Sequence, residues 1–538
     1  MKKIGLIAVL SVMVCSAWAV PARRGEIVKT QPDGTQIVVY QYGDEHFHWM
    51  TNEKGEWLKM DIDGFYRVTE ALSAEQIEAK RMAAPSRAAQ AATPLNIAPR
   101  GLVILVNFTD MAFETDKAEM DSMLTGKNYT RDYSYFYRGK KQSITSKGSA
   151  WQYFYDSSNG HYDPQFDVIG PVTVSKNMAY YGKNVNDFDA APWTMVKEAC
   201  QLVDDNVDFK QYDNNNDGYV DFVYVIYAGY GEADGGDKNT IWPHSYWLLE
   251  AGITCKLDGK YVDLYACGNE MDSRTNYHTG IGTFCHEFSH VLGLPDLYET
   301  TGYGTYKTIG AWSILDYGPY NNDGNTPPAY SAYEQFFMGW LMPRLIVDAE
   351  NVELEELQAS NSALLISSSD QHNLIGNDPK PTTFYLLENR QQVGWDEYLP
   401  GHGLMLTKVQ YDYNKWINNT VNNSSNRMGV DLIEADGKKP SSSSNGYTGK
   451  AGDLFPAGAT EYLGITNHSI EDVSEQDGII YFKYRGGIAT STEQVQTKET
   501  IVAIYNILGQ KQAAVDIESL PHGTYVVVTT AGSKKIVR

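Results

Sequence analysis

The sequence is poor in basic residues and has no hydrophobic run long enough to cross a membrane. Its 538 residues include 44 Lys and Arg against 67 Asp and Glu, which gives a formal net charge of −23. This excess of carboxylates argues against nucleic acid or an anionic membrane surface as a partner. The apolar run from Ile4 to Val14 is shorter than the roughly 20 residues that a membrane-spanning helix needs. We therefore expect no nucleic-acid partner and no membrane span.

Cysteine is also scarce, with five residues in the whole chain. Beyond the N-terminal segment, Cys200, Cys255, Cys267 and Cys285 allow several alternative pairings. An oxidising compartment permits disulfides without requiring them. Cys255 and Cys267 are close enough in sequence to join the two strands of a hairpin, whereas Cys285 could be a small buried apolar residue. The sequence alone leaves the pairing open.

The first residues have the pattern of a secretory signal peptide. Lys2 and Lys3 precede the short apolar run, and Ala17 and Ala19 supply the small residues of a cleavage site. We expect residues 1–19 to be removed and the protein to be secreted.

The most informative stretch of the chain runs from Cys285 to Asp296. His286 and His290 stand four apart, so on a helix both imidazoles leave the same face and can hold one zinc ion. Glu287 lies where a carboxylate can take a proton from a metal-activated water. Gly293 can end the helix in a left-handed turn that returns Asp296 as a third ligand. A core helix with merely hydrogen-bonded histidines is the alternative, but it does not account for the combined spacing.

A second metal motif precedes the zinc motif. Alternating oxygen-bearing side chains with a glycine at the sharp bend are typical of a loop around calcium. The predicted calcium ligands are Asp213, Asn215, Asp217, Tyr219 and Asp221. Tyr224 stands where an EF-hand requires Glu, so the loop is not an EF-hand. A turn without metal is the alternative, since Asp and Asn favour turns on their own.

The length and an apolar fraction of 42% predict several globular domains. Short strands separated by Gly, Asp and Asn follow the signal peptide, and an Ala-rich stretch, Met82–Pro94, comes next. Arg81, Arg87 and Arg100 offer sites for a trypsin-like cut near that stretch. We interpret this part as a prodomain, with an ordinary accessory domain as the alternative.

The rest of the chain changes pattern twice. Buried strands at Leu102–Phe108 and Val220–Ala228, with helices opening near Pro192 and Pro328, predict an α/β core. Short strands and turns follow, and the chain ends in a linker and an alternating, sandwich-like segment. The predicted divisions are a signal peptide (1–19), a prodomain (20–98), a zinc metallopeptidase catalytic domain (99–345), a β-rich domain continuing the peptidase module (346–486), a linker (487–498) and a C-terminal domain (499–538).

A turn after the zinc motif, Trp312–Gly318, corresponds in position to the methionine-bearing turn that lies beneath the metal in metzincin-type proteases. Leu315 stands where methionine is expected, and the two side chains are similar in volume. Tyr317 lies two residues further on, where a hydroxyl could stabilise an oxyanion. A packed turn aromatic is the equally weighted alternative for Tyr317.

Residues 99 to about 460 resemble the immune inhibitor A family of secreted metallopeptidases, within the metzincin-like zincins. The resemblance implies a zinc endopeptidase in which Glu287 is the base and residues 20–98 are a propeptide. It also implies a multidomain fold: an α/β zincin catalytic domain with a β-rich prodomain and C-terminal β-sandwich domains. The motifs are H-E-F-S-H-V-L-G-L-P-D-L-Y (286–298), P-Q-F-D-V-I-G-P-V (164–172), D-x-N-x-D-G (213–218), W-P-H-S (242–245), E-N-R-Q (388–391), L-P-G-H-G (399–403) and A-D-G (435–437).

Residues 499–538 resemble the C-terminal sorting domain of the type IX secretion system of Bacteroidetes-type Gram-negative bacteria. The match lies in I-Y-N-I-L-G-Q (504–510), L-P-H-G-T-Y (520–525) and the terminal K-K-I-V-R. It implies the type IX machinery as a partner, and a secreted or outer-membrane-associated location. A plain adhesive Ig-like domain is the alternative.

The sequence therefore predicts a secreted zinc endopeptidase made as a zymogen, with protein or peptide substrates and with zinc and calcium as cofactors. A binding protein on an inactive zincin scaffold is one rival, although it would have no need of Glu287. A metal hydrolase acting on non-peptide bonds is the other. Whether Asp44 or His46 of the prodomain caps the zinc remains open at this stage.

Overall fold

The computed structural model describes residues 20–23, 25–44, 47–61, 63–73, 76–77, 100–185, 188–301, 308–439, 449–487, 501–506, 511–512, 524–529 and 532–537. The predicted signal peptide, the Ala-rich stretch 82–94 and most of the predicted linker lie outside these ranges. Within them, no helix is both long enough and apolar enough to cross a bilayer.

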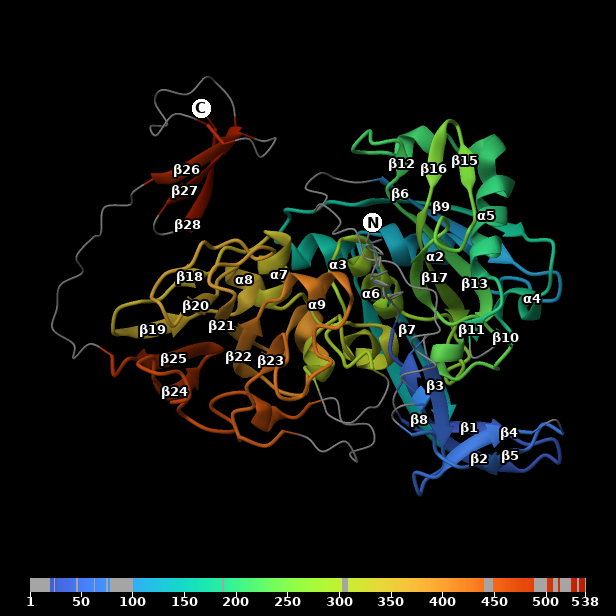
Figure 1. The fold of residues 1–538 in the computed structure, drawn as a ribbon, viewed down its shortest axis with the longest axis horizontal. Helices are drawn as coiled ribbons and strands as arrows, with labels where there is room; N and C mark the ends of the chain where they lie inside the picture. The colour runs from blue at the N-terminus through green and yellow to red at the C-terminus, as the bar shows by residue number, and fades with distance from the viewer. Residues whose placement is uncertain are drawn as a thin grey trace, which may run out of the picture.

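The chain from residue 27 to 68 forms a five-stranded antiparallel sheet, drawn in blue in Figure 1. Trp49 and Trp57 stack on it with ring centroids 5.1 Å apart. Short strands are what the sequence pattern predicts for this part of the chain. The strands of this N-terminal sheet are β1 (Ile27–Thr30), β2 (Gln36–Asp44), β3 (Phe47–Thr51), β4 (Trp57–Met60) and β5 (Tyr66–Val68).

A central five-stranded sheet organises residues 100–342, in the order β14-β17-β13-β6-β9. β9, β6, β13 and β17 are parallel, and the edge strand β14 is antiparallel to β17. The strands are β6 (Arg100–Asn107), β9 (Gln165–Thr173), β13 (Val223–Tyr230), β14 (His244–Trp247) and β17 (Leu264–Met271). The predicted buried strands at 102–108 and 220–228 correspond to β6 and β13.

Helices cover both faces of the central sheet, because alternate residues of each strand point to opposite sides. On β6, Val103 and Leu105 join the core beneath α2, α3 and α6, whereas Leu102 and Ile104 join the core beneath α4 and α5. The helices are α2 (Lys117–Thr125), α3 (Ala150–Ser157), α4 (Met178–Gly182), α5 (Pro192–Val203) and α6 (Gly282–Val291). The mixed α/β architecture predicted for this part is therefore observed.

Small hairpins and short strands decorate the central sheet. Pairs β7–β8 and β10–β11 are antiparallel, and β12, β16 and β15 form a three-stranded sheet. Their bounds are β7 (Thr130–Tyr137), β8 (Lys140–Lys147), β10 (Asn184–Val185), β11 (Phe188–Asp189), β12 (Tyr219–Val220), β15 (Cys255–Leu257) and β16 (Lys260–Val262).

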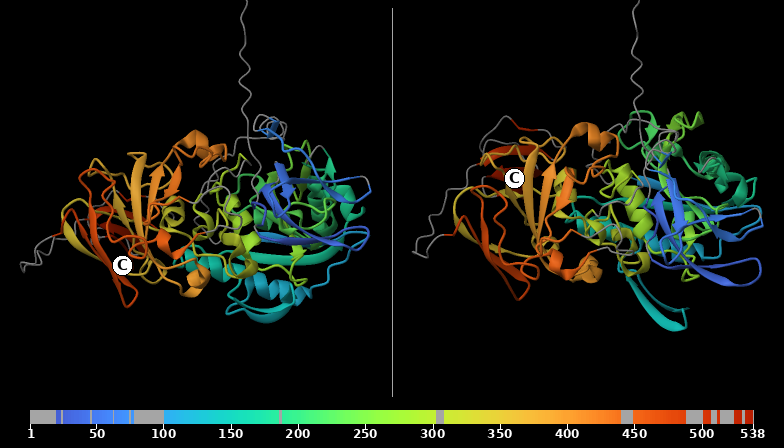
Figure 2. Two further views of the ribbon diagram at one scale, coloured as in Figure 1. Left: turned by 90° about the horizontal axis from the view of Figure 1, so that it is seen from below. Right: turned by 60° about the horizontal axis from the view of Figure 1, so that its bottom comes forward.

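Residues 344–484 form two further sheets that share the core of the zinc-motif helix. Phe384, Leu386 and Met405 belong to the same buried cluster as Phe284 and Phe288 of α6. Figure 1 shows α6 between the central sheet and these strands, and Figure 2 shows the same arrangement from two other directions. One sheet has the order β18-β20-β21-β22-β23 and the other β19-β25-β24. This part of the chain therefore helps to enclose α6.

The strands of these sheets lie where the sequence predicts short strands and turns. They are β18 (Arg344–Leu345), β19 (Glu350–Leu354), β20 (Leu364–Ile366), β21 (Thr383–Arg390), β22 (Gly403–Gln410), β23 (Val430–Leu432), β24 (Ile470–Gln476) and β25 (Ile479–Tyr484). The accompanying helices are α7 (Ala332–Met338), α8 (Leu357–Ser360) and α9 (Tyr413–Ile417). A three-stranded antiparallel sheet follows, with β26 (Ile501–Asn506), β27 (Thr524–Thr529) and β28 (Gly532–Val537).

Two local predictions differ from the structure. The helix expected to open at Pro328 begins at Ala332, because Ser331 caps it through a reciprocal capping box with Glu334. The suggested Cys255–Cys267 bridge is wrong, since both cysteines are free. Cys255 lies close enough to Cys200 of α5 for that thiol to be the first cause of its pKa shift, and Cys267 lies in a different sheet.

Candidate metal centre

Helix α6 is anchored by its apolar side and presents its two histidines inside the protein. Phe284 and Phe288 meet the ring of Phe166 on β9 with centroids 5.2 Å away. After the helix, Gly293 adopts a φ of 95°, in the left-handed region that favours glycine. The chain reverses there and brings Asp296 back to the histidines, as the sequence predicts.

Three donor atoms converge at this turn. The Nε2 atoms of His286 and His290 are 3.0 Å apart, and each lies 3.3 Å from Oδ1 of Asp296. Ligands about 2.0–2.1 Å from a tetrahedral zinc ion stand about 3.3 Å from one another. In the described ranges, these are the His, Cys, Asp or Glu side chains whose donor atoms cluster closely enough to hold a metal ion.

Hydrogen bonds to backbone carbonyls fix both imidazole rings. Nδ1 of His286 lies 2.7 Å from the carbonyl oxygen of Ile314, and Nδ1 of His290 lies 2.8 Å from that of Leu294. A carbonyl can only accept, so each Nδ1 carries the proton and each Nε2 presents a lone pair. Both lone pairs are directed towards Asp296.

A residue from the β-rich region holds the third carboxylate. The side chain of Asn419 donates to Oδ2 of Asp296 at 2.6 Å and accepts from the backbone N–H of Asp296 at 2.7 Å. Oδ1 of Asp296 is buried and has no hydrogen-bond partner. Asn419 lies 123 positions from Asp296 and follows α9, where no local sequence pattern marks it.

The charge states of this cluster suit a divalent cation. Burial lowers the pKa of His286, and the neighbouring His290 lowers it further. Burial alone would raise the pKa of Asp296, but positive charge placed at His290 and His286 outweighs it and holds that pKa below its usual range. Neutral imidazoles and an ionised carboxylate are the forms that bind zinc. An orphaned carboxylate oxygen facing two lone pairs therefore fits a zinc ion.

Glu287 lies beside the cluster and is fully buried. Its Oε1 accepts a hydrogen bond from the backbone N–H of Val20 at 2.9 Å, and its Oε2 has no partner. Burial and the negative charge of Asp296 raise the pKa of Glu287 well above its ordinary value. A carboxyl with a raised pKa, next to a metal site, can exchange a proton with a bound molecule.

The contact with Val20 belongs to a buried N-terminal segment, Val20–Arg23, that runs through the site. The indole N–H of Trp242 donates to the carbonyl of Val20 at 3.1 Å, and the hydroxyl of Tyr320 donates to the carbonyl of Pro21 at 2.7 Å. The backbone N–H of Arg23 donates to the carbonyl of Ala233 at 2.8 Å. The segment is therefore held by both backbone and side chains of residues 233–320.

Sequence reasoning missed Trp242, Tyr320 and Asn419 as parts of the site. Trp242 belongs to the W-P-H-S motif, so the family resemblance could have indicated it, whereas no pattern marks the other two. The open question about a capping residue is answered only in part. Asp44 is buried in β2, accepts from the N–H of Phe47 at 3.3 Å and is not among the converging donors. His46 lies outside the described residues.

The turn at Trp312–Gly318 lies against the metal centre. Leu315 is fully buried, and its carbonyl accepts from the N–H of Leu297 at 2.8 Å, next to Asp296. Tyr317 is half-buried. The pKa of Tyr320 is raised mainly by burial, with smaller contributions from Asp234 and Tyr317, while Arg23 opposes the rise. Leu315 is thus buried next to the segment that carries Asp296, and its role as the apolar floor beneath a metal stays a prediction.

The predicted calcium ligands lie in one short segment: Asp213, Asn215 and Asp217 precede β12, Tyr219 belongs to β12, and Asp221 follows it. The carboxylate of Asp213 accepts from the N–H groups of Asp217 and Gly218 and pairs with Lys260. The carboxylate of Asp221 accepts from the backbone and side chain of Asn214 at 2.7 and 2.6 Å. These carboxylates are not among the side chains found to cluster as metal donors in the described residues. The loop is thus formed, while calcium remains a prediction.

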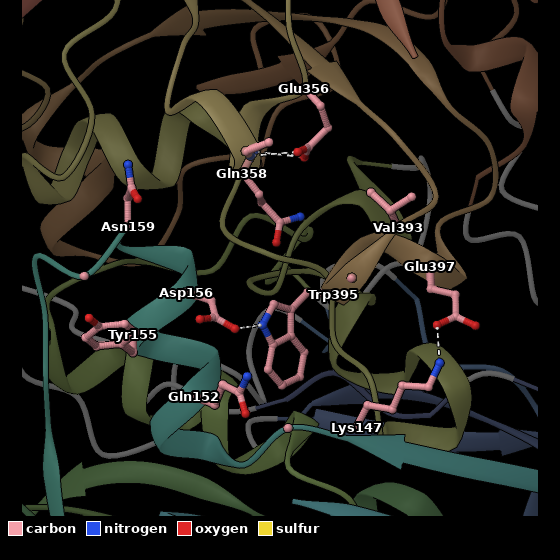
Figure 3. A pocket seen from close by; sticks show the side chains of 14 residues that line it. Lys147, Gln152, Tyr155, Asp156, Asn159, Glu356, Gln358, Val393, Trp395 and Glu397 are labelled. Carbon is pink, nitrogen blue, oxygen red and sulfur yellow. Dashed lines mark hydrogen bonds and ion pairs between the residues drawn. The ribbon is translucent and has the colours of Figure 1, made fainter. Parts of the chain in front are cut away.

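A pocket of about 580 Å³ lies between α3 and the segment around Trp395, and the metal donors are not part of its lining (Figure 3). Its polar groups are largely paired: Lys147 with Glu397 at 3.0 Å, and the indole of Trp395 with Asp156 at 3.0 Å. None of its lining residues is a metal donor or Glu287. The pocket lies between the central domain and the β-rich region, and its lining residues form no catalytic cluster.

Comparison with known proteins gives several curated relatives, of which two are described. The pre-pro-metalloprotease PrtV of Vibrio cholerae serotype O1 is 27% identical over 293 residues, which cover 48% of this chain and 31% of PrtV. Immune inhibitor A of Bacillus thuringiensis subsp. alesti is 27% identical over 268 residues, which cover 44% of this chain and 39% of that protein. The chain thus spans less than half the length of either relative.

Part of the chain also matches a family model. The residues matched are 96–342, and the model is described as the catalytic domain of immune inhibitor A peptidase M6. This range includes His286, Glu287, His290 and Asp296. The part of the chain that builds the candidate metal centre is therefore similar to the catalytic domain of the M6 metallopeptidases.

Proposed function

We propose that the protein is a secreted zinc-dependent endopeptidase, made as a zymogen, that hydrolyses peptide bonds. The observation that carries the proposal is the convergence of His286, His290 and Asp296 beside the buried carboxyl of Glu287. The match of residues 96–342 to a peptidase catalytic domain supports the peptide bond as the bond that is cut.

His286, His290 and Asp296 would hold the zinc, which when bound polarises the scissile carbonyl and activates water. Glu287 accepts the proton of the attacking water and later delivers it to the leaving amine. The raised pKa of Glu287 suits a carboxyl that carries this proton between the two steps. Tyr317 is proposed to donate its hydroxyl to the oxyanion, a role supported by its place on the turn next to the metal donors.

The zymogen part of the proposal rests on Val20. Val20 follows the predicted signal-peptide cut, and its nitrogen already bonds to the carboxyl of Glu287. After the cut this nitrogen becomes an ammonium group, whose bond to a carboxylate is shorter and stronger than that of an amide. Ala22 is hydrogen-bonded to the carbonyl of Gly43 in the N-terminal sheet, which keeps the segment in place. Glu287 is then unable to act as a base.

The proposal extends to the C-terminal region and to calcium. We propose export by the type IX machinery through residues 499–538, which leads to a secreted or surface-associated enzyme of a Gram-negative bacterium acting on protein or peptide substrates. Support comes from the motifs at 504–510 and 520–525 and from the strands β26–β28. Calcium at Asp213–Asp221 would stabilise the loop before β12.

The test is casein hydrolysis by the chain that starts at Val20, after limited trypsin treatment. Glu287→Ala is expected to keep one zinc ion per chain and the circular dichroism spectrum, and to lose hydrolysis. An o-phenanthroline control should abolish the activity of the unmodified chain. Undiminished turnover by Glu287→Ala would refute the base assignment. One bound zinc without any hydrolysis, after the segment around Arg81 and Arg87 has been cut, would favour the binding-protein alternative.

A further inference from the structure

The Val20–Arg23 segment lies in the site as the C-terminal half of a cleaved peptide would, with its first nitrogen next to Glu287. In peptide hydrolysis, the catalytic carboxyl gives its proton to the nitrogen that leaves with the C-terminal half of the substrate. The nitrogen of Val20 is 2.9 Å from Oε1 of Glu287, so it occupies the place of that leaving nitrogen. Val20 then corresponds to the first residue after the scissile bond, and Arg23 to the fourth.

The side chain of Arg23 fills an acidic pocket. Its guanidinium pairs with the carboxylate of Asp272, which is 5% exposed, and with Oδ1 of Asp323 at 2.8 Å. It also lies over the ring of Tyr320, 5.8 Å from the centroid. Only about 20 Å³ of cavity remains around the segment. The pocket thus complements an arginine side chain in both size and charge.

The walls of this pocket are formed by residues outside the N-terminal sheet. Apart from Val20 and Arg23 themselves, all the residues that line the cavity lie between Ala233 and Gly324. The residues of the pocket therefore remain in the catalytic part of the chain when the N-terminal region leaves.

Removal of Arg23 leaves the pocket short of one positive charge. Burial, and next the charge of Asp272, raise the pKa of Asp234 to about 8, so the pocket's ion pairs with Arg23 are those of Asp272 and Asp323. Arg274 pairs with Asp323 and compensates one of them. Oδ1 of Asp234, a residue that is 9% exposed, has no hydrogen-bond partner. A buried carboxylate without a counter-ion is costly, so the vacated pocket favours a new cation.

We propose that Asp272 and Asp323 form a substrate subsite that selects arginine or lysine at the fourth position after the scissile bond. The inference rests on the proposed peptidase activity and names its substrate class: proteins and peptides with a basic residue on the leaving side of the cut. Arg23 occupies this subsite in the latent chain in the way that a substrate side chain does in the active one.

The experiment uses the trypsin-activated full chain and a matched set of quenched fluorescent peptides. The peptides share one sequence and differ only at the fourth position after the scissile bond, which is Arg, Lys, Ala or Glu. We expect kcat/KM for Arg to exceed that for Ala by about ten- to a hundredfold, the range for hydrogen bonds to charged groups. The Glu peptide should be the poorest, and mass spectrometry of the products fixes the position of the cut.

Pocket variants separate recognition from catalysis. Asp272→Asn and Asp323→Asn should reduce the Arg-to-Ala ratio towards one while they still cleave the Ala peptide. Asp237→Asn, at an exposed aspartate outside the pocket, should leave the ratio unchanged. The ratio is internal to each enzyme, so partial misfolding of a variant does not alter it. If one variant fails to fold, the ratios of the other variant and of the unmodified chain still decide.

The outcomes distinguish failure of the subsite proposal from failure of the peptidase proposal. Equal cleavage of the Arg and Ala peptides by the unmodified chain would overturn the subsite and leave the peptidase proposal intact; the pocket would then only anchor the N-terminal segment. An unchanged Arg preference in both pocket variants would also overturn it. Absence of cleavage of all peptides and of casein would count against the peptidase proposal itself.

Discussion

Replacement of Asn419 by alanine is expected to weaken zinc binding without touching a metal ligand. Asn419 exchanges two hydrogen bonds with Asp296, one to the carboxylate and one to the backbone. Both residues are buried, so water does not replace these bonds readily. Alanine frees Oδ2 of Asp296, and the carboxylate can rotate away from His286 and His290.

The magnitude follows from the two bonds. A hydrogen bond to an ionised group contributes about 1.5–3 kcal/mol, and this bond is at its strongest when the carboxylate is held against the metal. Loss of a group that orients a ligand typically weakens metal affinity by about 10- to 100-fold, which corresponds to about 1.4–2.8 kcal/mol. The two figures agree. The second bond, to the N–H of Asp296, is present with and without metal and should mainly lower the melting temperature.

The assay is zinc competition against a chromophoric chelator, followed by thermal unfolding with and without zinc. Asn423→Ala is the matched control, because Asn423 lies in the same loop but bonds to Thr300 at 2.8 Å instead of to Asp296. It should lose stability and keep its zinc affinity. Wild-type zinc affinity in a folded Asn419→Ala chain would refute the reasoning that Asn419 orients the third ligand.

Three shorter predictions concern the ligands, the pH dependence and calcium. Asp296→Ala should lose zinc on dialysis, and unchanged metal content by atomic emission would place the third ligand elsewhere. The folded pKa of Asp234, about 8, lies above the ordinary aspartate value of 3.8, so the folded chain holds a proton that the unfolded chain releases. The stabilisation that comes from this proton should therefore be lost as pH rises from about 4 to 8. Calorimetry should show that the melting temperature of Asp234→Asn falls less over this pH range than that of the unmodified chain. Calcium should raise the melting temperature of the unmodified chain and not that of Asp213→Ala; equal shifts would contradict a site in that loop.

The zinc motif could be predicted because its spacing is local. Helical periodicity places His286 and His290 on one face, and Gly293 permits the left-handed turn that returns Asp296. Two strands of the central sheet could be predicted for a similar reason, since the continuous apolar runs of β6 and β13 indicate strands that are buried on both faces. These features depend on the order of neighbouring residues.

The contacts that complete the site could not be predicted, because they join distant parts of the chain. Asn419 reaches Asp296 across 123 positions, and Val20 reaches Glu287 across 267. Nothing in the sequence around Asn419 or Val20 indicates that either residue contacts the site. The failed Cys255–Cys267 pairing has the same origin: the two cysteines are close in sequence, but β15 pairs with β16, whereas β17 belongs to the central sheet.

A cut in the chain and the appearance of activity should be separate events. The Val20–Arg23 segment is held by bonds from Trp242 and Tyr320 and by the ion pairs of Arg23, none of which a cut near Arg81 or Arg87 breaks. On the proposed function, the severed N-terminal region remains bound as a product-like inhibitor until it dissociates. We therefore expect cleavage, followed on a gel, to precede hydrolysis of a fluorescent peptide.

Dilution distinguishes this mechanism from direct activation by the cut. If a bound fragment blocks Glu287, the specific activity of the cut chain should rise when the enzyme is diluted below the dissociation constant of the fragment. Arg23→Ala removes the two ion pairs and should shorten the lag, whereas Arg67→Ala removes only the exposed pairs with Asp61 and Asp63 and should not. Activity that appears together with the cut and is independent of dilution would refute inhibition by the N-terminal segment, because dissociation would then not limit access to Glu287.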